Sequence, residues 1–209
     1  MAPTLKLDYF DIKGRAEPIR LALTIAGLDF EDYRLGKDEW PKMKPTTPFG
    51  QVPVLHIDGK PVTQCVPIIR YIGKIAPESG LYPSDAWNAL KVDEFMSAVD
   101  DAAALLRPSF FESDPEKKIQ ARKDLSAPEG ALTKSLANLE RAVGKTAGKF
   151  AVGDTLTIAD LLLYSQKTQL ESGLLDGLPT NMYDSLPTLT KVCAAVKNHP
   201  KVKEWESKH

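Results

Sequence analysis

The first third of the chain alternates short runs of apolar and aromatic residues with one amphipathic stretch. Leu5 to Phe10 and Glu31 to Leu35 have the composition and length of short strands. The residues between them predict an amphipathic helix that ends near Gly27, because glycine commonly follows the last helical turn. The apolar positions of this helix are Ile19, Leu21, Leu23, Ile25 and Ala26.

A hairpin and another helix follow. Val52 to Ile57 and Pro61 to Val62 are predicted strands joined by Asp58-Gly59, a dipeptide typical of tight turns. The order βαβαββα is that of a small α/β unit with a mixed sheet, of the thioredoxin type. The last helix of this order ends near Pro77, and its apolar positions are Ile68, Ile69, Tyr71 and Ile72.

The remainder of the chain has only helical patterns. The segment Pro77 to Ser84 is rich in proline, glycine and serine and is the best linker candidate. We therefore expect an N-terminal thioredoxin-like domain at residues 1–80, a linker at 81–86 and an all-α domain at 87–209. Trp205 and the charged tail from Lys201 to His209 could cover the mouth of a functional site, but we favour a frayed terminus. The helical patterns run from Trp87 to Leu106, Pro115 to Ala142, Thr157 to Glu171 and Leu186 to Asn198.

Composition narrows the function classes. A formal net charge of -1 gives no drive toward nucleic acid or an acidic membrane. No apolar run approaches the roughly 20 residues that span a bilayer, and the N-terminus lacks a signal pattern. The 2 cysteines make no disulfide framework or CxxC pair, and the 3 histidines make no convincing zinc site. We expect a cytoplasmic protein with no metal, no nucleic acid and no membrane.

The segment from Phe49 to Leu55, with Gln64 and Cys65 after it, carries the most information about function. Proline lacks a backbone N–H, so Pro53 belongs at the start or edge of a strand. An extended peptide could pair with Val52 there as an added strand. The helix start after Gln64 offers free N–H groups and a positive dipole end to a carboxylate. The segment thus favours a small peptide ligand with an acidic group.

These features place the chain beside a known family. Leu5 to Asp11 followed by Gly14-Arg15-Ala16-Glu17, then Asp38 to Pro41 with Lys44, resemble motifs of the cytosolic glutathione S-transferases. The capping-box pattern Thr157 to Asp160 resembles that family's late helix cap. The resemblance covers nearly the whole chain and is closest to the tyrosine-type, sigma-like branch.

The resemblance implies glutathione as a co-substrate, with no permanently bound cofactor and no metal. Tyr9 would donate a hydrogen bond to the glutathione thiolate and lower the thiol pKa, and Arg15 would assist. The activated thiolate would then add to an apolar electrophile. The plainer alternatives are a core aromatic for Tyr9 and, for Arg15, a solvated side chain or one paired with Glu17 or Asp11.

The same resemblance implies the residues that bind glutathione. Trp40 and Lys44 would reach its glycyl end, although a half-buried tryptophan and a solvated lysine are the ordinary interpretation. Asp101, otherwise half of a solvated acidic pair with Asp100, would reach glutathione from the partner subunit. The full glutathione-binding set is Tyr9, Arg15, Trp40, Lys44, Gln51, Val52, Pro53, Gln64, Cys65 and Asp101.

Cys65 departs from the family pattern, which has serine after the glutamine. A thiol is a weaker donor than a hydroxyl and a poor N-cap, so the expected effect is weaker glutathione binding. A cysteine at a helix N-terminus can also be acidified and redox-sensitive. We favour an inert replacement over a catalytic cysteine, because Tyr9 already occupies the thiolate position.

The resemblance also implies a homodimer, with Phe49 inserted into the partner subunit or packed at the interface. The expected walls of the electrophile pocket are Phe10, Ile12, Arg107 and Phe111. Two alternatives remain open. One is a glutathione-dependent isomerase of the prostaglandin D synthase type, whose members carry a tryptophan where this chain has Leu105 to Pro108. The other is a non-catalytic ligand-binding or structural member, to which Cys65 lends some weight.

Overall fold

The computed structural model describes residues 3–36 and 38–209. The chain forms two compact units, which are described separately below. The first unit extends to Tyr82 and also includes Pro200–His209, and the second is Pro83–His199. The sequence-based division instead assigned all of residues 87–209 to the helical domain.

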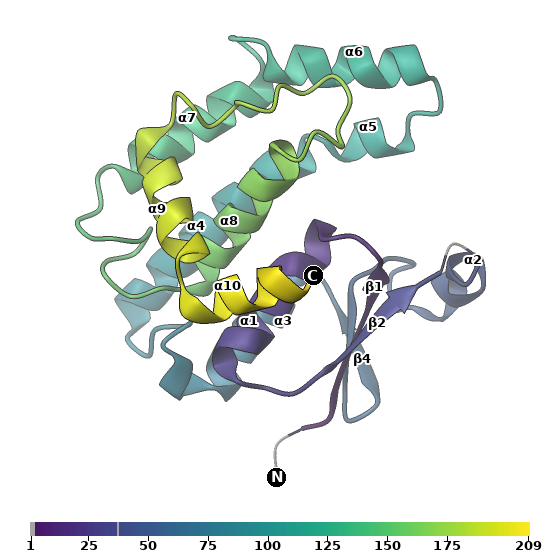
Figure 1. Ribbon diagram of the computed structural model, residues 1–209, viewed down its shortest axis with the longest axis vertical. Helices are drawn as coiled ribbons and strands as arrows, with labels where there is room; N and C mark the ends of the chain where they lie inside the picture. Colours follow the sequence, from purple (N-terminus) through teal and green to yellow (C-terminus); the bar gives the residue numbers. More distant parts are fainter. Residues whose placement is uncertain (1–2, 37) are drawn as a thin grey trace. The chain divides into compact units, whose positions relative to one another are not determined.

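The first unit is built on a 4-stranded sheet with strand order β2-β1-β3-β4 (Figure 1). β1 pairs parallel to β2, with Tyr9 opposite Arg34, while β3 is antiparallel to both β1 and β4. This is the mixed sheet that the sequence predicts. The strands are β1 (Leu5–Phe10), β2 (Glu31–Leu35), β3 (Val54–Ile57) and β4 (Lys60–Thr63).

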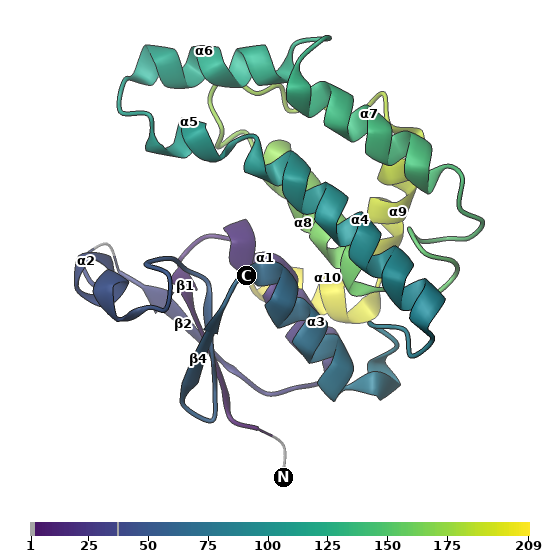
Figure 2. The same cartoon turned by 180° about the vertical axis from the view of Figure 1, so that it is seen from behind.

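Two long helices supply the rest of this core. Helices α1 and α3 lie side by side, and both pack fully buried aliphatic residues such as Ile19 and Ile69 (Figure 2). Leu7 and Leu55, which are paired across β1 and β3, are also fully buried. The remaining elements of the first 82 residues are short. The helical elements are η1 (Gly14–Ala16), α1 (Glu17–Ala26), α2 (Trp40–Met43), η2 (Lys44–Thr46), α3 (Cys65–Ile75) and η3 (Pro77–Ser79).

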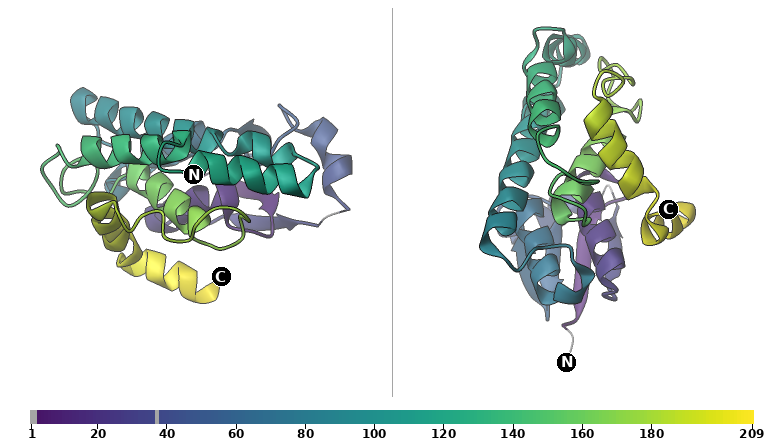
Figure 3. Two further views of the ribbon diagram at one scale, coloured as in Figure 1. Left: turned by 90° about the horizontal axis from the view of Figure 1, so that it is seen from above. Right: turned by 90° about the vertical axis from the view of Figure 1, so that its left-hand side faces the viewer.

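The second unit is helical. Its centre is α8, which contacts both α4 and α9 and buries most of its side chains (Figure 3). The predicted capping box is confirmed at its N-terminus, where Asp160 accepts hydrogen bonds from the N–H and the hydroxyl of Thr157. The helices are α4 (Ala86–Ala104), α5 (Arg107–Phe111), α6 (Pro115–Ser126), α7 (Ala131–Val143), α8 (Ile158–Leu170) and α9 (Pro187–Lys197).

The predicted helix from Pro115 to Ala142 is wrong, since the structure has two helices there. Ala127 takes an extended ψ of 160° before Pro128, whose ring disfavours the helical conformation of the preceding residue. Gly130 then passes so close to α6 that a Cβ would lie 2.3 Å from the Leu125 carbonyl oxygen. The break therefore has a local cause that periodicity does not report.

The C-terminal tail is also different from the expectation, because it is helical instead of frayed. Helix α10 (Pro200–Lys208) contacts α1, and these contacts place the last residues in the first unit (Figure 1). Val202 of this helix is fully buried. Among the described residues, no helix is both long and apolar enough to cross a membrane.

Candidate active site

Tyr9 is buried near the end of β1, and its ring contacts that of Phe10 with centroids 5.5 Å apart. The backbone N–H of Arg15 donates to the Tyr9 hydroxyl oxygen over 3.1 Å. Because that oxygen already accepts a bond, the phenol proton is left to donate to a ligand. Burial raises the pKa of Tyr9 above 10.0, and the Arg15 N–H and charge only partly oppose this. Tyr9 is therefore protonated at neutral pH, as a hydrogen-bond donor to a thiolate must be.

Gly14 makes this arrangement possible. Its φ is +43°, in the region that favours glycine, and a Cβ built on it would lie 2.6 Å from the Tyr9 hydroxyl oxygen. Any side chain here would collide with the group that the site depends on. Gly14 belongs to the sequence motif described above, but the motif did not predict that its backbone lies so close to the Tyr9 hydroxyl.

Arg15 acts on Tyr9 through its backbone N–H, and its positive charge also lowers the Tyr9 pKa. The predicted role of its guanidinium toward the thiolate stays a prediction. The two acids considered as its partners also bind other cations. Glu17 pairs with Arg20 at 3.2 Å, and Asp11 pairs with Arg34 at 3.2 Å.

The short segment around Trp40 lies beside the same strand end. The Trp40 ring meets Phe10 edge to face, with centroids 5.6 Å apart. Glu39 fixes this segment, since its carboxylate accepts from the Tyr33 hydroxyl at 2.5 Å and from the Gly36 N–H at 2.6 Å. Sequence reasoning assigned no role to Glu39. Its partners, a tyrosine hydroxyl and a backbone N–H, form no sequence motif that would have predicted the two bonds.

Lys44 begins the next short element, η2, and its side chain reaches Gly50. A Cβ on Gly50 would lie 3.8 Å from the Lys44 Cε. Lys44 is thus brought toward the loop before β3, which also carries the expected ligand-pairing residue Val52.

The loop before β3 has the form expected of a peptide-binding edge. The Val52–Pro53 peptide bond is cis, and β3 begins only at Val54, later than predicted. Within the described residues, neither backbone group of Val52 forms a hydrogen bond, so both can pair with an extended ligand. Gln51 and Gln64 are exposed and approach each other, with 3.5 Å between their amide groups.

Gln64 and Cys65 stand at the start of α3. Gln64 has a positive φ of 74°, which is uncommon for a non-glycine residue and places it outside the helix. Cys65 is the first helical residue and is only 2% exposed. Its burial is in keeping with an inert replacement for serine, because a reactive cysteine needs access to solvent.

Arg20 is a residue that sequence reasoning missed. Its side chain is fully buried on α1, and its Nε donates to Asp32 at 3.0 Å. Its Nη1 donates to the carbonyl oxygen of Ile12 at 2.9 Å. The signal was available, because a lone cation between Ile19 and Leu21 in an apolar helix must find partners if it is buried.

The remaining predicted residues belong to the second unit or to exposed positions. Phe49 is 69% exposed and Ile12 is 53% exposed in the first unit. Arg107 and Phe111 lie on α5, where Phe111 is 82% exposed. Asp101 is exposed on α4, within the second unit.

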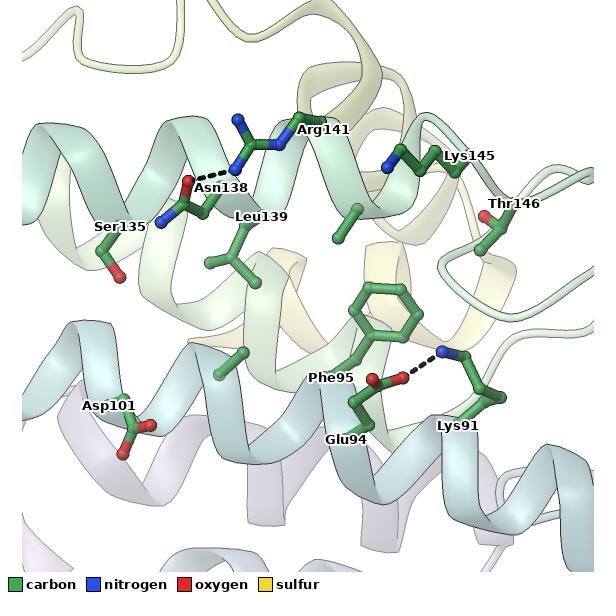
Figure 4. A pocket seen from close by; sticks show the side chains of 12 residues that line it. Lys91, Glu94, Phe95, Asp101, Ser135, Asn138, Leu139, Arg141, Lys145 and Thr146 are labelled. Carbon is green, nitrogen blue, oxygen red and sulfur yellow. Dashed lines mark hydrogen bonds and ion pairs between the residues drawn. The ribbon is translucent and has the colours of Figure 1, made fainter.

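Asp101 lines a cavity of about 590 Å³ between α4 and α7 (Figure 4). Its wall combines apolar side chains such as Phe95 and Leu139 with polar ones, among which Arg141 donates to Asn138 at 2.7 Å. The residues that line this cavity all belong to the second unit, so the expected glutathione-binding residues of the first unit take no part in it. Among the described residues, no cluster of His, Cys, Asp and Glu could hold a metal ion.

A thioredoxin-like first unit, a helical second unit and a tyrosine hydroxyl held by a backbone N–H define the class of the protein. The description "Glutathione S-transferase, N-terminal domain" matches residues 5–74, and "Glutathione S-transferase, C-terminal domain" matches residues 100–209. The chain is 35% identical over 208 residues to "Glutathione S-transferase 1" of Ascaris suum, covering 97% of this chain and 95% of the relative. The chain belongs to the glutathione S-transferase family.

Two solved structures extend the comparison. The prostaglandin synthase D of Nilaparvata lugens has a TM-score of 0.87 at 30% identity, covering 99% of this chain and 98% of that one. A glutathione S-transferase of Necator americanus described as monomeric has a TM-score of 0.78 at 30% identity, covering 99% and 97%.

Proposed function

We propose that this protein is a glutathione transferase in which Tyr9 activates the glutathione thiol for addition to apolar electrophiles. The observation that carries the proposal is the bond from the Arg15 N–H to the Tyr9 hydroxyl oxygen, which leaves the phenol proton available. A protonated Tyr9 donates to the glutathione sulfur and favours its thiolate form. The thiolate then forms a C–S bond to the electrophile, which expels a leaving group or takes up a proton.

Glutathione is held by residues of the first unit in this proposal. Its backbone pairs with Val52 beside Gln51 and Pro53, because the Val52 backbone groups are unpaired within the described residues. The γ-glutamyl carboxylate binds at Gln64 and Cys65, where the start of α3 supplies backbone N–H groups. The glycyl end reaches Trp40 and Lys44, whose segment Glu39 fixes.

The electrophile and the partner subunit complete the proposal. In this proposal the electrophile contacts Phe10 and the exposed Ile12 of the first unit. Arg107 and Phe111 of the second unit stay predicted electrophile residues. In a homodimer, Asp101 of one subunit reaches the glutathione of the other. A cytoplasmic location fits the two free cysteines, since thiols persist in the reducing compartment where glutathione is abundant. The sigma-like assignment stays a prediction.

The decisive experiment is Tyr9→Phe, followed by the thiolate absorbance of bound glutathione against pH. We expect the pKa of the bound thiol to rise and turnover of chlorodinitrobenzene to fall, at a loss of about 2–4 kcal/mol by analogy with an oxyanion-hole donor. Glutathione affinity should change little, because other residues hold the peptide. Tyr71→Phe is the matched control, since its hydroxyl forms no hydrogen bond within the described residues. An unchanged titration in Tyr9→Phe would refute the assignment.

The isomerase alternative has one observation in its favour, the similarity to a prostaglandin synthase D structure at a TM-score of 0.87. An isomerase uses glutathione without consuming it, so product formation from a prostaglandin endoperoxide with constant free thiol would favour it. Retention on glutathione-agarose without turnover of either substrate would instead indicate a non-catalytic carrier.

A further inference from the structure

The turn that activates Tyr9 is connected by hydrogen bonds to the last helix of the chain. Trp205 on α10 donates from its indole Nε1 to Glu17 Oε1 over 3.0 Å. The other oxygen of Glu17 accepts from Arg20 Nη1 at 3.2 Å. A single carboxylate on α1 thus joins the C-terminal helix to a buried arginine.

Arg20 continues this connection into the turn itself. Its Nη1 donates to the carbonyl oxygens of Ile12 at 2.9 Å and Lys13 at 3.3 Å. These two residues directly precede Gly14 and Arg15. Since the Arg15 N–H is the donor to Tyr9, the position of this turn sets the geometry of the bond to the Tyr9 hydroxyl. The set Trp205, Glu17 and Arg20 is called the relay below.

Burial makes the members of the relay depend on one another. The side chain of Arg20 is fully buried and that of Glu17 is 6% exposed. Within the described residues, Nη2 of Arg20 has no hydrogen-bond partner. If Arg20 lost its bond to Glu17, no second acceptor beside Nη2 would compensate for it. A buried charge that loses a partner either costs several kcal/mol or forces its surroundings to move. The part of the surroundings that Arg20 binds through backbone carbonyl oxygens is the turn at Ile12 and Lys13.

Helix α10 is held against the first unit by further contacts, which fix the position of the Trp205 indole. Lys201 donates to the Ile25 carbonyl oxygen of α1 at 2.8 Å. The rings of Trp205 and Phe30 lie with centroids 6.0 Å apart. Lys13 of the turn also pairs with Glu206 of α10 at 3.7 Å. The last helix therefore holds the turn by two routes.

We infer that Trp205, Glu17 and Arg20 are positioning residues, through which the C-terminal helix keeps the Arg15 N–H aimed at the Tyr9 hydroxyl. None of the three needs to touch glutathione. The inference rests on the proposed function of Tyr9 for its effect on catalysis, while its effect on the turn stands independently.

The test is Trp205→Phe in the full chain, which removes the indole N–H and keeps an aromatic ring against Phe30. Trp87→Phe is the control, because Trp87 is 69% exposed on α4 in the second unit. We expect Trp205→Phe to raise the pKa of bound glutathione by about half a unit to one unit, which is a roughly three- to tenfold loss of thiolate below that pKa. The KM for glutathione should stay within about twofold, because the peptide is held by other residues.

A second readout separates this inference from the proposed function. The backbone amide resonance of Arg15 should shift in Trp205→Phe and in Tyr9→Phe, and should stay in place in Trp87→Phe. If Tyr9→Phe leaves the thiol titration unchanged, the proposed function fails, and the Arg15 resonance still reports on the relay.

A merely structural role for Trp205 gives a different result. Trp205→Phe would then lower the melting temperature while the Arg15 resonance and the thiol pKa remain those of the wild type, and this overturns the inference. Should Trp205→Phe not fold, Glu17→Gln removes the shared charge at nearly constant volume. That variant must shift both readouts for the inference to stand.

Discussion

At the scale of single residues, side-chain chemistry was predictable and backbone chemistry was not. The position of Tyr9 at the end of a strand followed from the sequence, whereas the burial of Cys65 was found only in the structure and its inertness stays a prediction. The donor to Tyr9 did not follow, because a backbone N–H has no signature in the sequence. The need for glycine at position 14 is likewise visible only once the Tyr9 hydroxyl is placed beside it.

Gly14→Ala should damage activity more than stability. The new Cβ would lie 2.6 Å from the Tyr9 hydroxyl oxygen, so the tyrosine or the turn must move. Gly59→Ala is a matched control, because Gly59 also has a positive φ, +78°, but has nothing within 4 Å of a Cβ. Both variants should lose about 1–2 kcal/mol of unfolding free energy from backbone strain. In chlorodinitrobenzene assays, only Gly14→Ala should lose turnover; equal activity of the two variants would contradict this account of the site.

At the scale of elements, the sequence predicted the strands and most helices because their apolar periodicity is strong. The predictions fail where tertiary contacts or a proline, and not apolar periodicity, determine the structure. The break between α6 and α7 depends on Pro128 and on a close backbone approach at Gly130. Helix α10 has few apolar residues, and its order comes from contacts with α1 that no local pattern encodes.

The junction of α7 and α9 predicts an acid-sensitive contribution to stability. Glu140 on α7 accepts from the N–H groups of Thr188 at 2.8 Å and Leu189 at 2.9 Å, in the first turn of α9. Burial raises the pKa of Glu140, but these hydrogen bonds outweigh it and the net pKa lies below 4.5. Because the folded-state pKa is lowered, the contribution is present above pH 4.5 and is lost as pH falls through the folded-state value.

Glu140→Gln should therefore lower the unfolding free energy by about 1 kcal/mol at pH 7, a figure kept small for a solvent-accessible carboxylate. The difference from the wild type should shrink in urea titrations carried out below pH 4. Glu129→Gln is the control, because Glu129 pairs with Lys134 at 2.9 Å while its side chain remains 88% exposed. A constant difference between pH 7 and pH 3 would show that Glu140 does not act through its charge.

At the scale of the whole molecule, the family and the two-part architecture were predictable from motif order, whereas the boundaries were only partly so. The assignment of residues 200–209 to the first unit depends on contacts between the two ends of the chain. The homodimer remains a proposal, and one structural relative is described as monomeric. Phe49 is the residue through which it can be tested.

Phe49→Ser should shift the sedimentation of the protein toward the monomer at low concentration. Phe49 is 69% exposed in the isolated chain, as expected of a side chain that a partner covers. If Asp101 of the partner binds glutathione as proposed, the dissociated variant should also have a raised KM for glutathione. Phe111→Ser is the control, since it removes an 82% exposed ring from α5 and should alter electrophile KM without changing sedimentation. If Phe49→Ser sediments like the wild type, Phe49 is not an interface residue.

The bond from Trp205 to Glu17 joins residues 188 positions apart, and this has a consequence for synthesis. A ribosome adds about 5–20 residues per second, so on the order of ten seconds or more pass between the synthesis of Glu17 and that of Trp205. During that interval the nascent N-terminal unit has its sheet and both long helices available, yet one side of α1 is uncovered. Its polar groups must be satisfied by water or by a chaperone. The bond from Trp205 to Glu17 can therefore form only after α10 has been synthesised.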